Sequence, residues 1–123
     1  MSTSLPYVDG FVIPVPRDKI DAYKAVAEKA SRIWKEHGAL DYYECLADDL
    51  EVKDMRSFTE TAAAKADETV VFAFIVYPSR EARDATNAAV MADPRIKDMC
   101  GQSEGVFDCS RMSYGGFRTI VRA

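Results

Sequence analysis

The side chains of this sequence best suited to proton transfer are two carboxylates and the single histidine. Histidine titrates near neutral pH without special tuning, and a carboxyl does so when burial raises its pKa. Three aromatic residues could line a ligand pocket beside them. Because neighbouring residues of a strand point to opposite faces, these side chains form a pool from which a site could be drawn, not one cavity. The catalytic candidates are Asp9, His37 and Glu44, and the ligand-binding candidates are Trp34, Tyr43 and Tyr114.

Asp9 lies in an apolar run with Phe11 and Ile13. A carboxyl in such surroundings could act as a general base with a raised pKa. The alternative is an acid at a strand end that is solvated or paired with an arginine such as Arg111 or Arg118. We favour this alternative, with the acid either solvated or paired, since structural ion pairs also perturb acids.

His37 ends a predicted helix, where a cationic imidazole would complement the helix dipole. This structural role explains the residue without catalysis, although a site role stays open. Trp34, one turn earlier, could form the floor of a shared pocket, but its place on the apolar stripe favours the core. With Asn87, these two residues include the types that surround haem in haem-degrading enzymes of similar fold. The sequence has no matching motif, so we expect no haem.

Glu44 shares a strand face with Tyr42 and Leu46, whereas Tyr43 lies on the other face. Charges are rarely buried without a partner, so an ion pair with an arginine across the sheet is the expected state of Glu44. Its other possible role is as an acid working with Tyr114.

The periodicity of the chain predicts the order strand, helix, strand, strand, helix, strand. This is the order of a ferredoxin-like α+β domain with an antiparallel sheet, covering residues 1–123. A polar excursion at Glu51–Glu68, with a short strand or turn near Met55–Phe58, could cover a site or reach a partner. The predicted elements are Tyr7–Val15, Arg17–His37, Leu40–Leu50, Val70–Tyr77, a helix capped by Ser79 that ends near Ala92, and Met112–Val121.

The strand Val70–Tyr77 is apolar on both faces, so both faces should be covered. Two helices can cover only one face of a four-stranded sheet. Each large apolar side chain left exposed forgoes roughly 1.5–3 kcal/mol of burial free energy. We therefore expect a homodimer in which two sheets pack face to face as a dimeric α/β barrel.

Composition excludes several classes of function. The net charge of −4 and the absence of a basic stripe disfavour nucleic acid and anionic membranes as partners. No stretch is long and apolar enough to span a bilayer, and no export signal is visible, so we expect a cytoplasmic protein. The odd count of three cysteines then favours reduced thiols, and neither their spacing nor one histidine suits zinc. We expect no metal and no cofactor.

Several blocks of the sequence together resemble one family of small bacterial proteins. The blocks are Tyr7-Val8-Asp9-Gly10-Phe11, Pro14-Val15-Pro16, Trp34 to Leu40, Tyr43, Glu44, Asp48-Asp49, Glu68 to Phe72, Val90 to Arg95, and Tyr114-Gly115-Gly116-Phe117. They resemble the domain of unknown function 1428 family, the YbaA-like proteins. The resemblance implies a dimeric α/β barrel and no established activity, so it transfers no catalytic residue.

Two functions are compatible with these observations. The first is binding or transformation of a small molecule in a pocket between sheet and helices. By analogy of fold alone, such a protein could resemble a cofactor-independent monooxygenase. The second is a non-catalytic homodimer that serves assembly or partner binding. A closed pocket with convergent polar groups would favour the first, and a filled core the second.

Overall fold

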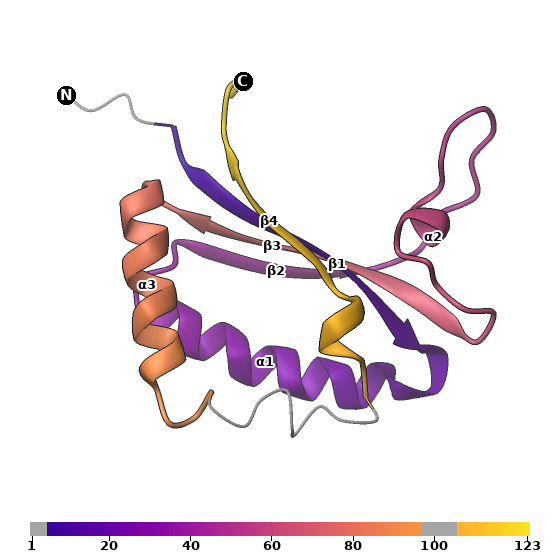
Figure 1. Ribbon diagram of the computed structural model, residues 1–123, viewed down its shortest axis with the longest axis horizontal. Helices are drawn as coiled ribbons and strands as arrows, with labels where there is room; N and C mark the ends of the chain where they lie inside the picture. Colours follow the sequence, from indigo (N-terminus) through magenta and orange to yellow (C-terminus); the bar gives the residue numbers. More distant parts are fainter. Residues whose placement is uncertain (1–4, 97–105) are drawn as a thin grey trace.

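The computed structural model describes residues 5–96 and 106–123 (Figure 1). Four antiparallel strands form one sheet in the order β2-β3-β1-β4, with α1 and α3 on one side. This order and the chain sequence confirm the predicted ferredoxin-like α+β fold. The elements are β1 (Tyr7–Pro16), the 3-10 helix η1 (Arg17–Lys19), α1 (Ile20–Glu36), β2 (Asp41–Leu46), α2 (Phe58–Thr61), β3 (Glu68–Tyr77), α3 (Arg80–Ala92), the 3-10 helix η2 (Cys109–Arg111) and β4 (Ser113–Arg118).

Along the central strand β1, side chains alternate between the two faces of the sheet, as its sequence predicts. Asp9, Ile13 and Val15 are buried on the face that meets the helices. The two prolines, Pro14 and Pro16, were expected at an edge because proline cannot donate to a sheet ladder. β1 is instead central, but β4 pairs only with residues 7–12 of it. Beyond that point β1 pairs with β3 alone, so the prolines occupy a local edge of the sheet.

Helix α1 buries the stripe that its sequence predicts: Tyr23, Ala27, Ala30 and Ile33. Gly38 follows with φ of 123°, a left-handed conformation that glycine adopts without a steric penalty. The predicted helix stop is therefore confirmed. Among residues 5–96 and 106–123, no helix has the length and apolar character needed to cross a membrane.

Helix α3 begins at the predicted cap, where the Ser79 hydroxyl accepts a hydrogen bond from the Ala82 N–H at 3.0 Å. Thr86 and Val90 are its buried residues. Arg83 and Asn87 are half-buried and lie one turn apart on the same helix. The Asp93-Pro94 pair that follows could by its sequence start a short helix through Met99. Its second half lies outside the described residues, and Pro94–Ile96 form a turn.

Residues 47–67, between β2 and β3, form an arm that contains α2 and stands out from the sheet on the side away from α1 (Figure 1). β2 ends at Leu46, earlier than predicted, and the expected strand or turn near Phe58 is a single helical turn that Ser57 caps. The arm returns at Glu68, whose carboxylate receives two hydrogen bonds from Arg111 at 2.7 and 2.9 Å. The hydrogen bonding from Arg111, followed by a smaller effect of the Lys65 backbone N–H, lowers the pKa of Glu68 to about 2. The base of the arm is thus fixed to η2.

The cysteines depart from the prediction. Cys45 is free, as expected, but it is exposed, whereas its place in a strand predicted a buried residue; Cys109 is disulfide-bonded. Cys100 lies outside the described residues. The expectation of three free thiols is wrong at Cys109, because an odd count still allows two cysteines to pair. The number of cysteines therefore no longer supports the prediction of a reducing compartment.

The face of the sheet away from the helices, here called the open face, carries a row of aromatic rings. Tyr43 stacks on Phe74 with centroids 4.9 Å apart, and Phe72 contacts both Phe74 and Phe58 at 6.0 Å. Phe72 is 43% exposed and Tyr43 52% exposed. On the neighbouring edge, Phe117 lies over Gly10 and is 63% exposed. The second apolar face of β3 is therefore only partly covered by the described residues of one subunit.

Candidate functional site

A cluster of polar side chains surrounds Asp9 on the helix-facing side of the sheet. Asp9 is 1% exposed, and its carboxylate accepts hydrogen bonds from Arg83 Nη1 at 3.0 Å and from the Tyr114 hydroxyl at 3.2 Å. Arg83 also donates to the Tyr114 hydroxyl at 2.9 Å. Of the two states expected for this acid, solvated or paired, the structure has the ion pair, and its cation comes from α3. Of the two arginines first considered, Arg111 binds Glu68 instead.

The ring of Tyr7 completes this Asp9 cluster. The Arg83 guanidinium carbon lies 5.0 Å from the centre of that ring, a distance typical of cation–π contacts. Tyr7 in turn lies against Gly116 of β4, where any Cβ would overlap the tyrosine hydroxyl. A glycine pair inside a strand favours a bulge or a close contact, and at Gly115-Gly116 the structure has the close contact. This glycine allows β4 to accept the ring that holds Arg83 toward Asp9.

A second layer of hydrogen bonds connects this cluster to α1. The Asn87 Oδ1 atom accepts from the Tyr77 hydroxyl and from Trp34 Nε1, both at 3.2 Å. Burial, followed by the charge of Asp9, raises the pKa of Tyr77. Trp34 and Asn87 therefore bind each other, and their polar atoms point into this network.

Glu44 forms a separate cluster with two tyrosines between β2 and α1. Its carboxylate accepts hydrogen bonds from Tyr23 at 2.6 Å and from Tyr42 at 2.8 Å. Within the described part of the chain it has no salt bridge, so the expected arginine partner is replaced by two hydroxyls. Burial raises the pKa of Glu44, against the opposing effect of the two tyrosine hydrogen bonds. Burial also raises the pKa of both tyrosines, and the Glu44 charge adds to that effect.

The structure places two candidates away from these clusters. His37 follows α1 and contacts Asp93 Oδ2 through Nε2 at 2.9 Å. Arg95 holds the same aspartate, and the hydrogen bonds from Arg95 and His37 lower the pKa of Asp93. His37 thus joins the ends of α1 and α3. Tyr43 belongs to the aromatic row of the open face, as strand alternation requires.

Sequence reasoning named Asp9, Glu44, Trp34 and Tyr114 as candidates but missed the residues that hold them. Arg83 was overlooked because small residues dominate its helix and its charge suggested solvent. Its spacing of four residues from Asn87 was the available signal, since residues so spaced share a helix face. The other missed residues are Tyr7, Tyr23, Tyr42 and Tyr77.

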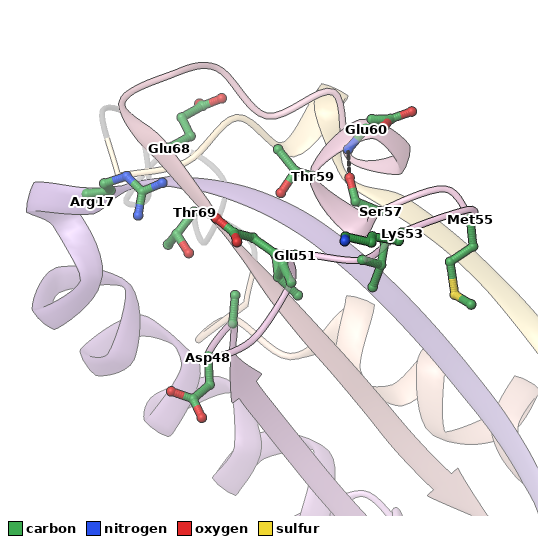
Figure 2. A pocket seen from close by; sticks show the side chains of 13 residues that line it. Arg17, Asp48, Glu51, Lys53, Met55, Ser57, Thr59, Glu60, Glu68 and Thr69 are labelled. Atoms are coloured by element: carbon green, nitrogen blue, oxygen red, sulfur yellow. Dashed lines mark hydrogen bonds between the residues drawn. The ribbon is translucent and has the colours of Figure 1, made fainter.

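Two hollows open at opposite ends of the sheet. One, of about 410 Å³, adjoins the Asp9 cluster through Tyr7 and Gly116 and is also lined by Arg80 and Arg118. The other, of about 790 Å³, lies between the arm and the sheet end (Figure 2). There Glu51 extends from the arm toward Thr69 of β3. Between sheet and helices, every buried polar side-chain atom of the described residues has a hydrogen-bond partner.

Comparison with known proteins places the chain in a family. Residues 6–109 match the family described as "Protein of unknown function (DUF1428)". The chain belongs to the DUF1428 family. YbaA of Escherichia coli K12, an uncharacterized protein, is 48% identical over 117 residues, which cover 95% of this chain and 98% of YbaA. YbaA of Shigella flexneri matches with the same figures. The family resemblance inferred from the sequence blocks is confirmed.

Solved structures with little sequence identity share the fold of this DUF1428 protein. A NIPSNAP family protein of unknown function from Agrobacterium tumefaciens aligns with a TM-score of 0.62 at 14% identity, covering 96% of this chain and 91% of its own. A dimeric ferredoxin-like protein from an uncultured marine organism aligns with a TM-score of 0.54 at 15% identity, covering 95% and 96%. At these identities the likeness concerns the fold alone.

The two clusters differ in what they can do chemically. Asp9 accepts hydrogen bonds from a cation and a hydroxyl, an arrangement that suits positioning of Arg83 more than proton transfer. Glu44 has no cation beside it in the described part of the chain, and burial raises its pKa against the effect of its two hydrogen-bond donors, which suits exchange of a proton. Among residues 5–96 and 106–123, no three His, Cys, Asp or Glu side chains are grouped to hold a metal ion.

The Asp9–Arg83 pair can be tested with a double-mutant cycle. Arg83→Met leaves a buried carboxylate without its cation, so we expect a loss of about 3–5 kcal/mol in the free energy of unfolding. Adding Asp9→Asn removes the charge and should restore much of that loss. Urea unfolding at pH 7 measures both, with the exposed Arg80→Met as the control. Simple additivity of the two single changes would show that the pair is not coupled.

The raised pKa of Glu44 predicts a pH dependence with a definite sign. Its folded-state pKa lies above the ordinary 4.5, so the folded chain binds this proton more tightly than the unfolded chain does. The contribution of Glu44 to stability should then fall as pH rises from about 4.5 through the folded-state pKa. Glu44→Gln should therefore gain stability relative to wild type between pH 4 and pH 7. Tyr42→Phe, which removes a hydrogen bond that lowers this pKa, should extend the decline to higher pH. Urea unfolding across this range measures both effects, and parallel profiles for wild type and Glu44→Gln would contradict the assignment.

Proposed function

We propose that this DUF1428 protein is a homodimer formed through the open faces of two sheets. The support is the row Tyr43, Phe74, Phe72 and Phe58, which continues an apolar strand onto a face without helices. Contiguous apolar patches of this kind mark interaction surfaces. A second copy offers an identical apolar surface, as a twofold interface requires.

We further propose that each subunit binds a small molecule with a carboxylate or phosphate group beside the Asp9 cluster. The observation that carries this proposal is the hollow of about 410 Å³ that Arg80 and Arg118 line next to Tyr7. Its size falls in the range of small-molecule sites, which combine apolar walls with a few placed polar groups. Leu5, Pro6 and Pro78 supply the apolar walls.

The Asp9 cluster has a supporting role in this site. Asp9 and Tyr114 fix the Arg83 guanidinium against the Tyr7 ring, which forms one wall of the hollow. Arg80 and Arg118 remain to meet the anion, since Arg80 has only a distant contact of 4.0 Å with Asp84. Arginine suits this recognition because its planar fork matches carboxylate and phosphate oxygens.

The competing function is assembly alone. The fully hydrogen-bonded layer between sheet and helices favours it, because that layer already satisfies its own polar atoms. The two functions share the homodimer and differ in the hollow beside Tyr7. Separate experiments therefore decide between them.

The homodimer predicts a solution mass of twice the 13.7 kDa chain by light scattering at micromolar concentration. Phe72→Asp should dissociate it, because a carboxylate without a partner is costly to bury in an apolar interface. Ala25→Asp, on the exposed side of α1, is the matched control and should remain a dimer. A monomeric wild type, or an equally stable Phe72→Asp dimer, would refute the proposed interface.

The ligand site predicts saturable binding of at least one small anion. Isothermal titration calorimetry with inorganic phosphate and a panel of mono- and dicarboxylic acids provides the measurement. Arg118→Gln should weaken binding by about tenfold or more, as expected when one charge-assisted hydrogen bond is lost. Arg32→Gln, on the exposed face of α1, should leave it unchanged. No binding by any probe, or equal losses in both variants, would leave assembly as the function.

A further inference from the structure

Two protruding segments flank the open face at opposite ends of the sheet. Residues 119–123, here called the tail, leave β4 and rise on the side away from α1, as the arm does at the other end (Figure 1). The tail exposes Ile120 by 76% and Val121 by 81%. The arm exposes Val52 and Met55, with Met55 71% exposed. Neither segment buries these side chains within its own subunit.

The two segments cannot meet within one subunit. The tail follows Arg118, which pairs with Tyr7, and Tyr7 pairs with Tyr77 at the last residue of β3. The arm ends at Glu68, the first residue of the same strand. Ten residues of strand span roughly 33 Å, far beyond the reach of a five-residue tail directed away from the sheet.

Their charges are complementary. Residues 47–67 carry six carboxylates and three cations, an excess of negative charge. The hollow at the base of the arm includes Asp48, Glu51 and Glu60 among its lining residues (Figure 2). The tail carries Arg122 and no acidic side chain, and it directly follows Arg118. An apolar, cationic segment and an apolar, acidic arm are thus available on the same side of the molecule.

We propose that the tail of one subunit packs against the arm of a second copy. This inference rests on the proposed homodimer. We place the twofold axis between the two facing sheets and across their strands, which exchanges the two ends and brings each tail to the end of the interface where the partner's arm stands. The contact then forms twice, at both rims of the interface. Ile120 and Val121 would cover Val52 and Met55, and Arg122 would face the acidic base of the arm. The occupant of this surface is therefore a second copy of the chain.

The test is photo-cross-linking of the full chain with p-benzoylphenylalanine placed at position 121. Mixed isotope-labelled and unlabelled chains, analysed by mass spectrometry, distinguish links between subunits from links within one. We expect links between subunits from position 121 to peptides of residues 47–60. The same probe at position 91, an exposed methionine site on α3, should give no link to the arm.

Light scattering and a truncation separate the possible failures. A monomeric wild type would refute the homodimer and this inference together. A dimer in which position 121 links only to its own chain, or to partner residues outside the arm, would refute this inference and leave the homodimer standing. Removal of residues 120–123 should raise the dimer dissociation constant about tenfold or more, because apolar contacts are lost at both rims. An unchanged constant would also overturn the inference.

Discussion

The structure depends on one constraint, which is that β3 is apolar on both faces while helices cover only one of them. Val71, Ala73 and Ile75 are buried beneath the helices, whereas Phe72 and Phe74 project to the opposite side. The connections that place both helices on one side leave the other side only partly covered by the described residues of the subunit. Burial of apolar surface is the dominant favourable contribution to folding and association, so the partly covered face directs the molecule toward assembly.

The helix-facing side of the sheet, in contrast, is covered within one subunit. Polar groups there are numerous, but each has a partner, and the partners come from different elements of the fold. Asp9 of β1 binds Arg83 of α3 and Tyr114 of β4, while Glu44 of β2 binds Tyr23 of α1. Such networks specify how helices sit on a sheet, since an unpaired buried polar group is costly. The same side chains therefore set the geometry of the fold and of the adjoining hollow.

Residue alternation explains which parts were predictable from the sequence. A period of two placed Asp9 on one strand face with Phe11 and Ile13 and separated Tyr43 from Glu44, and the order of strands and helices predicted the fold. The partner of Asp9 could not be read in this way, because pairing Arg83 with Asp9 depends on the packing of α3 on β1. Local patterns likewise do not show where β4 stops. Because β4 ends before it reaches Pro14, this proline has no partner on that side and fits a central strand.

Arg118 connects the two sides of the molecule. It lines the hollow beside Tyr7, and it is also the last residue of β4 before the tail leaves the sheet. If the tail is anchored on the partner's arm, the backbone at Arg118 is held at both ends, by the pairing with Tyr7 and by the docked Ile120 and Val121. Fixing a cation before a ligand arrives reduces the entropy lost on binding. The proposed anion site would then be fully organised only in the dimer, and anion affinity would depend on protein concentration near the dissociation constant of the dimer.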